Sequence, residues 1–117
     1  MRVEQKQFER YRKMKNVYEM NGYEYKQLYS CNAMVNKLGL ISYHTVIVDI
    51  DEQNGRVIMN LYHSNTTMSH VRKYIGYLRE CGKNDLADKV NACYRECIAS
   101  HISRVEWHNG VGVVVCE

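Results

Sequence analysis

The most regular alternation of hydrophobic and polar residues lies in the middle of the chain. Valine and isoleucine occupy every second position from Val46 to Ile50, the period-two pattern of a strand with one buried face. Asn54-Gly55 follows, a dipeptide typical of hairpin turns because both residues tolerate a positive φ. Apolar residues alternate again over residues 56–62. We therefore expect a central hairpin with strands over residues 40–51 and 56–62.

A helical pattern comes directly after this hairpin. Apolar residues recur at spacings of three and four between Val71 and Leu78, behind a cluster of helix-capping side chains at residues 64–67. The pattern predicts a helix over about residues 67–81, ended by Gly82 in the C′ position. A second apolar band predicts another helix, capped by Asn84 or Asp85 and extending to about residue 103. Two helices joined by so short a link form an αα-hairpin.

The two ends of the chain are less regular. Residues 2–20 contain strong helix formers and an aromatic stripe at helical spacing, ended by Asn21-Gly22, and predict an N-terminal helix. Residues 23–36 fit a helix in their first half, whereas alternation over residues 29–36 favours a strand. A turn at Asn109-Gly110 leads into a run of three valines, which predicts a last strand in this sheet or in that of a neighbouring protomer.

These elements predict the fold class. We expect one α+β domain over residues 1–117, because 117 residues suffice for a single hydrophobic core. Its small antiparallel sheet has three or four strands. The N-terminal helix and the C-terminal αα-hairpin pack on one face of that sheet.

Composition adds a bias toward binding surfaces. Ten tyrosines stand against one phenylalanine and one tryptophan. Tyrosine combines a large contact area with a polar group, which suits a protein that binds a partner, although it can equally replace phenylalanine in a core. The net charge is only +3, but residues 6–15 hold five basic residues against Glu9. This run is either the solvated face of a helix or a contact for phosphates.

The cysteines and the hydropathy indicate where the chain works. Five cysteines, an odd number, without an apolar secretory segment at the N-terminus indicate free thiols in a reducing compartment. No apolar run approaches the roughly 20 residues that a membrane span requires. We therefore expect a cytoplasmic protein that does not engage a membrane.

Two clusters contain residue types that commonly bind metal ions. Cys93, Cys97 and His101 share one helical face, with Cys81 as a fourth candidate. Cys93 and His101 would lie roughly 12 Å apart along the axis, too far to share one ion, so core packing is favoured. Three acids, Asp49, Asp51 and Glu52, resemble a Mg²⁺ site of nucleases, although acids beside a hairpin turn usually only improve solubility. We expect no metal and no cofactor.

No familiar catalytic motif is present. The chain has no GxSxG, HExxH or P-loop pattern, and no cysteine sits at a predicted helix N-terminus that would favour a thiolate. We therefore expect that the protein is not an enzyme.

The segment 62–70 carries more polar side chains than one helix cap requires. A single hydroxyl or amide satisfies a helix N-terminus, and the remaining groups surround free backbone N–H donors. Either the cap is over-determined, or this segment is an edge that binds an anion or a partner.

A resemblance appears in the same region. Ser42-Tyr43-His44-Thr45, then Gly55, then Tyr62, Ser64, Thr66, Thr67 and His70 resemble the pattern SYxT…G…YxSxTTxxH of small proteins from phages, prophages and plasmids. The resemblance covers roughly residues 29–79 and departs at His44, where another polar residue such as Asn is commoner. The family carries no activity to transfer. The resemblance implies a mobile-element origin and an intracellular bacterial setting.

These observations predict a phage-type accessory protein that acts by binding, for instance as an anti-CRISPR-like inhibitor of a host defence protein or ribonucleoprotein complex. The alternative is a small nucleic-acid-binding module that uses the basic N-terminal helix and tyrosine stacking. A homodimer is also expected, because the N-terminal helix and the last strand look under-buried. The expected contact residues are Arg10, Arg12, Lys13, Tyr43, Tyr62, His63, Thr66, Thr67 and His70.

Overall fold

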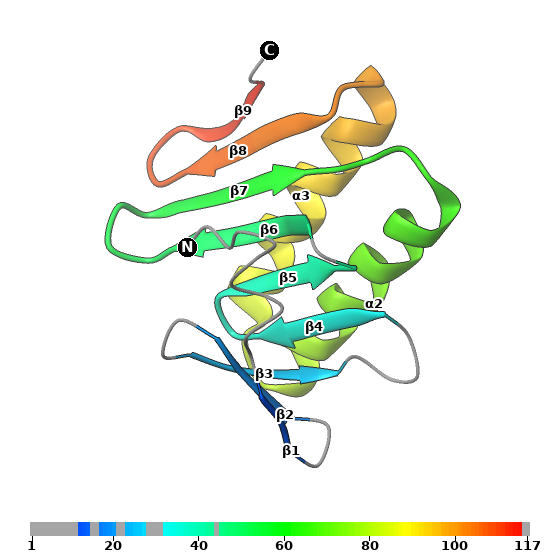
Figure 1. Ribbon diagram of the computed structural model, residues 1–117. Coiled ribbons are helices and arrows are strands. Elements are labelled where there is room, and N and C mark those ends of the chain that lie inside the picture. Colours follow the sequence, from blue (N-terminus) through cyan, green and yellow to red (C-terminus); the bar gives the residue numbers. More distant parts are fainter. Residues whose placement is uncertain (1–11, 15–16, 21–22, 28–31, 44, 116–117) are drawn as a thin grey trace.

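The computed structural model describes residues 12–14, 17–20, 23–27, 32–43 and 45–115, and its main feature is one antiparallel sheet. Within these residues the sheet has nine strands, and their order in space is their order in the sequence (Figure 1). The strands are β1 Arg12–Met14, β2 Val17–Met20, β3 Tyr23–Gln27, β4 Ala33–Asn36, β5 Gly39–Ser42, β6 Thr45–Asp51, β7 Arg56–Asn60, β8 Arg104–His108 and β9 Gly112–Val115.

Two helices lie between β7 and β8 in the chain and cover one face of the sheet (Figure 1). They are α2 Asn65–Glu80 and α3 Asn84–Ser100, and they pack against each other. A Schellman motif ends α2, because the Gly82 N–H donates to Arg79 O (3.0 Å) and the Lys83 N–H to Leu78 O (2.8 Å). Gly82 has a φ of 75°, the left-handed conformation that this motif requires. The predicted αα-hairpin is confirmed.

The hydrophobic core lies between the sheet and these helices. One row of paired residues crosses five strands, from Val35 through Leu40, Val48 and Met59 to Val105, and each of these side chains is buried. The helices contribute fully buried side chains to the same cluster: Val71, Tyr74, Leu78, Ala87, Val90, Cys93 and Cys97. The Tyr74 hydroxyl donates to Asn36 O (3.0 Å), which satisfies its polar group at the border of the core.

The central hairpin is confirmed, but its turn differs from the expected type. Strands β6 and β7 pair from Asp51↔Arg56 onward. In the turn Gly55 has a φ of 63°, whereas Asn54 does not reach positive φ and its side chain donates to Asp51 (2.8 Å). The turn is therefore not the type I′ turn in which both central residues have positive φ.

The predicted N-terminal helix is wrong where the structure describes it. Residues 12–14 and 17–20 are β1 and β2, which pair with each other and, through β2, with β3. The aromatic stripe has helical spacing, but strand pairing supplied by the tertiary structure outweighs local helix propensity. The rest of that prediction, residues 2–11 and 15–16, lies outside the described residues.

The prediction of a three- or four-stranded sheet is also wrong. The expected strand over residues 40–51 is interrupted at Tyr43, which separates β5 from β6, and β8 was not predicted at all. Most of the additional strands have only three to five residues, too short for a period-two pattern to stand out. The first residue of α3 is Asn84, after an N-cap Lys83 that makes no side-chain capping bond, so the predicted Asn84 or Asp85 cap is wrong as well.

Within the part of the chain that the structure describes, no helix is both long enough and apolar enough to cross a membrane.

Candidate functional site

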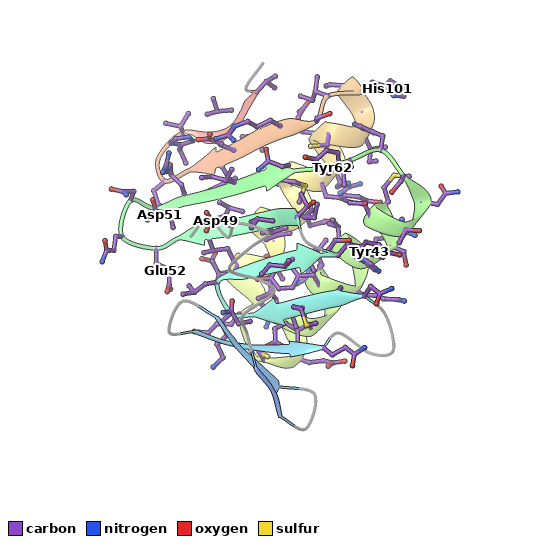
Figure 2. The ribbon with its side chains drawn as sticks, in the orientation of Figure 1. Tyr43, Asp49, Asp51, Glu52, Tyr62 and His101 are labelled. Carbon is purple, nitrogen blue, oxygen red and sulfur yellow. The ribbon has the colours of Figure 1, made fainter. Side chains whose placement is uncertain are left out.

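The two halves of the polar pattern, residues 42–45 and 62–70, meet at one end of the sheet. Tyr43 follows β5, Tyr62 follows β7, and α2 begins three residues after Tyr62. Figure 2 shows Tyr43 and Tyr62 at the same end of the sheet, the end at which α2 starts. Asp51 and Glu52 lie at the opposite end. The fold thus brings together residues that are about twenty positions apart in the sequence.

A buried hydrogen bond joins the two halves. Ser42 Oγ and His70 Nδ1 lie 2.7 Å apart, and each residue is only 3% exposed. Ser42 lies two residues after the buried Leu40 in β5, so its side chain projects to the same face of the sheet, the face that the helices cover. Each of the two side chains satisfies a polar atom of the other, which makes the burial of both tolerable.

The environment of His70 favours the neutral imidazole. Burial lowers the pKa of His70, and the positive charge of Lys73 lowers it further. A neutral imidazole can form the bond to Ser42 without bringing a charge into the interior. We conclude that the Ser42–His70 pair fastens α2 to β5.

Tyr43 follows Ser42 in the chain and has an unusual backbone conformation. Its φ is 56°, in the left-handed region that a bulky non-glycine residue rarely adopts. The Tyr43 N–H donates to Asn32 O (2.8 Å), and its ring centroid lies 6.1 Å from that of His70. The side chain is nevertheless 53% exposed. Such a conformation costs on the order of 1–3 kcal/mol and occurs preferentially at functional sites.

The start of α2 is capped as its sequence predicts. Ser64 is the N-cap, and its Oγ accepts a hydrogen bond from the Thr67 N–H (3.1 Å) and donates to Thr67 Oγ1 (2.9 Å). Thr67 is buried by this arrangement, whereas Thr66 is exposed. The first turn of α2 carries no acidic side chain, so the positive end of its dipole is not offset locally.

Tyr62 and His63 form the other side of this end. Tyr62 is 57% exposed. His63 is exposed as well, but its Nε2–H donates to Ile102 O (2.8 Å), just after α3. The ring of His101, the left-handed C-cap of α3, lies 6.4 Å from the His63 ring. His63 therefore ties the segment before α2 to the end of α3.

We name the exposed part of this region the tyrosine edge and define it as Tyr43, Tyr62, His63 and Thr66. Two other predicted contact residues, Thr67 and His70, lie in the interior and support the edge without being accessible to a partner. Arg12 and Lys13 lie in β1, at the far edge strand of the sheet, and Arg10 lies outside the described residues.

The structure places the other candidate clusters as follows. Cys93 and Cys97 are fully buried in the core, and burial raises the pKa of Cys97 to about 11, so this thiol is protonated. Asp51 is bound to Arg56 (3.1 Å) and Asn54, and the hydrogen bond from Asn54 is the main reason for its lowered pKa. Among the residues that the structure describes, no group of three or more His, Cys, Asp or Glu side chains is placed to hold a metal ion.

Sequence reasoning missed the role of Ser42. The pattern that resembles phage and plasmid proteins contains both Ser42 and His70, and this was the one signal that linked them. Nothing in the sequence indicated that two residues 28 positions apart share a hydrogen bond.

One family model matches residues 4–92 and is described as a family of unknown function, DUF8033. No curated protein and no solved structure matches the chain.

Proposed function

The chain belongs to this family of unknown function, DUF8033, and we propose that it acts by binding a protein partner through the tyrosine edge. The observation that carries the proposal is the exposure of Tyr43, a bulky side chain held in a strained backbone conformation. A strained residue persists only where the surrounding structure maintains it, and buried tyrosines are among the residues that dominate protein interfaces.

The edge is rigid, which favours binding. The Ser42–His70 bond lies beneath Tyr43, the Ser64 cap fixes the start of α2, and His63 is bonded to the end of α3. A surface that is already ordered loses less conformational entropy when a partner covers it.

We propose further that the role is not enzymatic. The hydroxyl of Ser42 lies 2.7 Å from the imidazole of His70, yet both residues are only 3% exposed and lie between β5 and α2. A substrate could not reach this hydroxyl without opening the packing between them.

The resemblance to phage, prophage and plasmid proteins refines the proposal. On that basis we propose a bacterial host cytoplasm as the setting and a host defence protein or ribonucleoprotein complex as the partner. The tyrosine edge would then block a functional surface of that complex, as an anti-CRISPR-like inhibitor does.

The test is capture of partners from bacterial lysate by the tagged protein, with and without nuclease treatment. We expect a protein partner that survives nuclease and is lost with Tyr43→Asn plus Tyr62→Ala. Asn suits a left-handed backbone, so this pair removes the rings while keeping the turn. Val111→Ser, an exposed position in the β8–β9 turn, is the matched control and should retain the partner. Equal capture by the tyrosine variant and the control would refute the assignment of the surface.

The second candidate function is binding of nucleic acid by tyrosine stacking with basic residues on phosphates. The sequence predicted a basic helix for this role, whereas the structure places Arg12 and Lys13 in strand β1. This function predicts affinity for DNA or RNA that falls steeply with salt and with charge reversal of Arg10, Arg12 and Lys13. Absent or salt-insensitive binding would exclude it.

We also propose that the protein forms a homodimer through β9. This strand is at the end of the sheet among the described residues, and Val113 and Val115 are exposed on it. An uncovered strand edge readily pairs with another chain. Static light scattering should give twice the chain mass of 13.8 kDa, and a monomer mass at working concentration would contradict the proposal.

A further inference from the structure

A cavity of about 330 Å³ lies at the end of the sheet opposite the tyrosine edge. It is lined by the β6–β7 turn, the α2–α3 loop, the first turns of α3 and the end of β8, and it is open to solvent on one side. The rim is held in place, since the Asn109 N–H donates to Gly55 O (3.0 Å) and thereby joins two hairpin turns. The volume is in the range of small-molecule sites, which starts at roughly 300 Å³.

One wall of the cavity includes an aromatic side chain. Trp107 lines it together with apolar side chains from the adjoining strands and from α3. The Lys89 ammonium lies 4.4 Å from the centroid of the Trp107 ring. An indole face of this kind binds planar rings by stacking.

Three cationic side chains from different elements also line the cavity: Arg56 of β7, Lys83 of the α2–α3 loop and Lys89 of α3. Three acids line the cavity as well. Asp51 pairs with Arg56 (3.1 Å) and Asp85 with Lys89 (2.9 Å), whereas Glu52 has no ion-pair partner among the described residues. Within the described part of the chain, the exposed Lys83 ammonium has no ion-pair partner. Lys83 is thus a cation available to a ligand on the rim.

We propose that this cavity binds a small planar anion, an aromatic or heteroaromatic ring that carries a phosphate or carboxylate group. The ring stacks on Trp107, and the anionic group accepts hydrogen bonds from Lys83 and from the guanidinium of Arg56.

Trp107 provides the readout, because it is the single tryptophan of the chain. We would titrate the protein with adenosine monophosphate and with benzoate, following tryptophan fluorescence excited where the tyrosines do not absorb. Adenosine, which has a ring without an anion, and inorganic phosphate, which has an anion without a ring, are the comparison ligands. A saturable change in fluorescence with adenosine monophosphate would show that the cavity binds a phosphate group. A change with benzoate alone would show that it binds a carboxylate group. No saturable change with either would overturn the proposal.

A variant tests the position of the anion. Lys83→Glu should raise the dissociation constant about tenfold or more, the loss typical of a charge-assisted hydrogen bond. Arg95→Glu makes the same change in net charge at an exposed position of α3 outside the cavity and should leave affinity unchanged. Equal affinity of the two variants, or adenosine binding as tightly as adenosine monophosphate, would overturn the role of Lys83.

Discussion

The two ends of the sheet differ in how their side chains are held. At the tyrosine edge, polar groups are satisfied in the interior by Ser42, His70 and Thr67, while large aromatic side chains face solvent. At the opposite end, charged residues pair with one another around a cavity and the aromatic ring of Trp107 is partly buried. The first arrangement leaves large aromatic side chains on the surface above a hydrogen-bonded interior. The second leaves a cavity lined by charged side chains.

Among variants that distinguish the two ends of the sheet, His70→Ala is expected to have the largest effect on stability. Removing a buried ring and leaving the Ser42 hydroxyl without its partner should lower the free energy of unfolding by about 3 kcal/mol. Urea denaturation measures it. The exposed His63→Ala should cost less than about 1 kcal/mol. Similar losses for the two variants would mean that the Ser42–His70 pair does not hold this end together.

At the cavity end the most sensitive position is Gly55. An alanine there would have to keep a φ of 63°, and its Cβ would clash with the side chain of Asn109. We expect Gly55→Ala to destabilise the protein by about 2 kcal/mol. Gly76→Ala, in the middle of α2 with no atom near the new Cβ, should instead stabilise it by about 0.5–1 kcal/mol. Thermal unfolding of the two variants distinguishes backbone strain from a general effect of added methyl groups.

A smaller change should separate stability from binding at the tyrosine edge. Tyr43→Gly removes the strain of a non-glycine residue at a φ of 56° and should stabilise the fold by about 1 kcal/mol. The same variant should lose the protein partner, because the exposed ring is gone. A variant that is destabilised and still binds would show that the strain at Tyr43 has no connection with recognition.

The smallest effect is a dependence of stability on pH. His70 has a folded pKa below its ordinary value of 6.5, so the unfolded chain binds the proton more readily. The stability from neutral His70 is therefore complete above pH 6.5 and declines as the pH falls below it toward the folded pKa. His70→Gln should show a flatter curve over that window in denaturant titrations. Identical pH profiles would mean that His70 does not titrate differently in the two states.

Local sequence patterns predicted the elements that are specified by turn, capping or periodic residues within the element itself. The hairpin around Gly55, both helices, the Ser64 cap and the Gly82 stop were all readable, because each depends on residues within a few positions. The same reasoning failed for β1, β2 and β8. Strands of three to five residues carry too few alternations, and their stability comes from the neighbouring strands.

For the candidate site, the pattern of residue types was enough to select Tyr43, Tyr62, His63 and Thr66 as candidate contact residues. Packing in three dimensions sets which of the six candidates from Tyr43 to His70 are accessible. Thr67 and His70 lie in the interior, where His70 Nδ1 meets Ser42 Oγ on the face of β5 that the helices cover. The cavity around Trp107 could not be predicted from the sequence either, because three stretches of the chain, residues 50–57, 82–89 and 107–109, form its walls. Burial and long-range contact depend on how distant segments pack, and no local pattern of residue types encodes them.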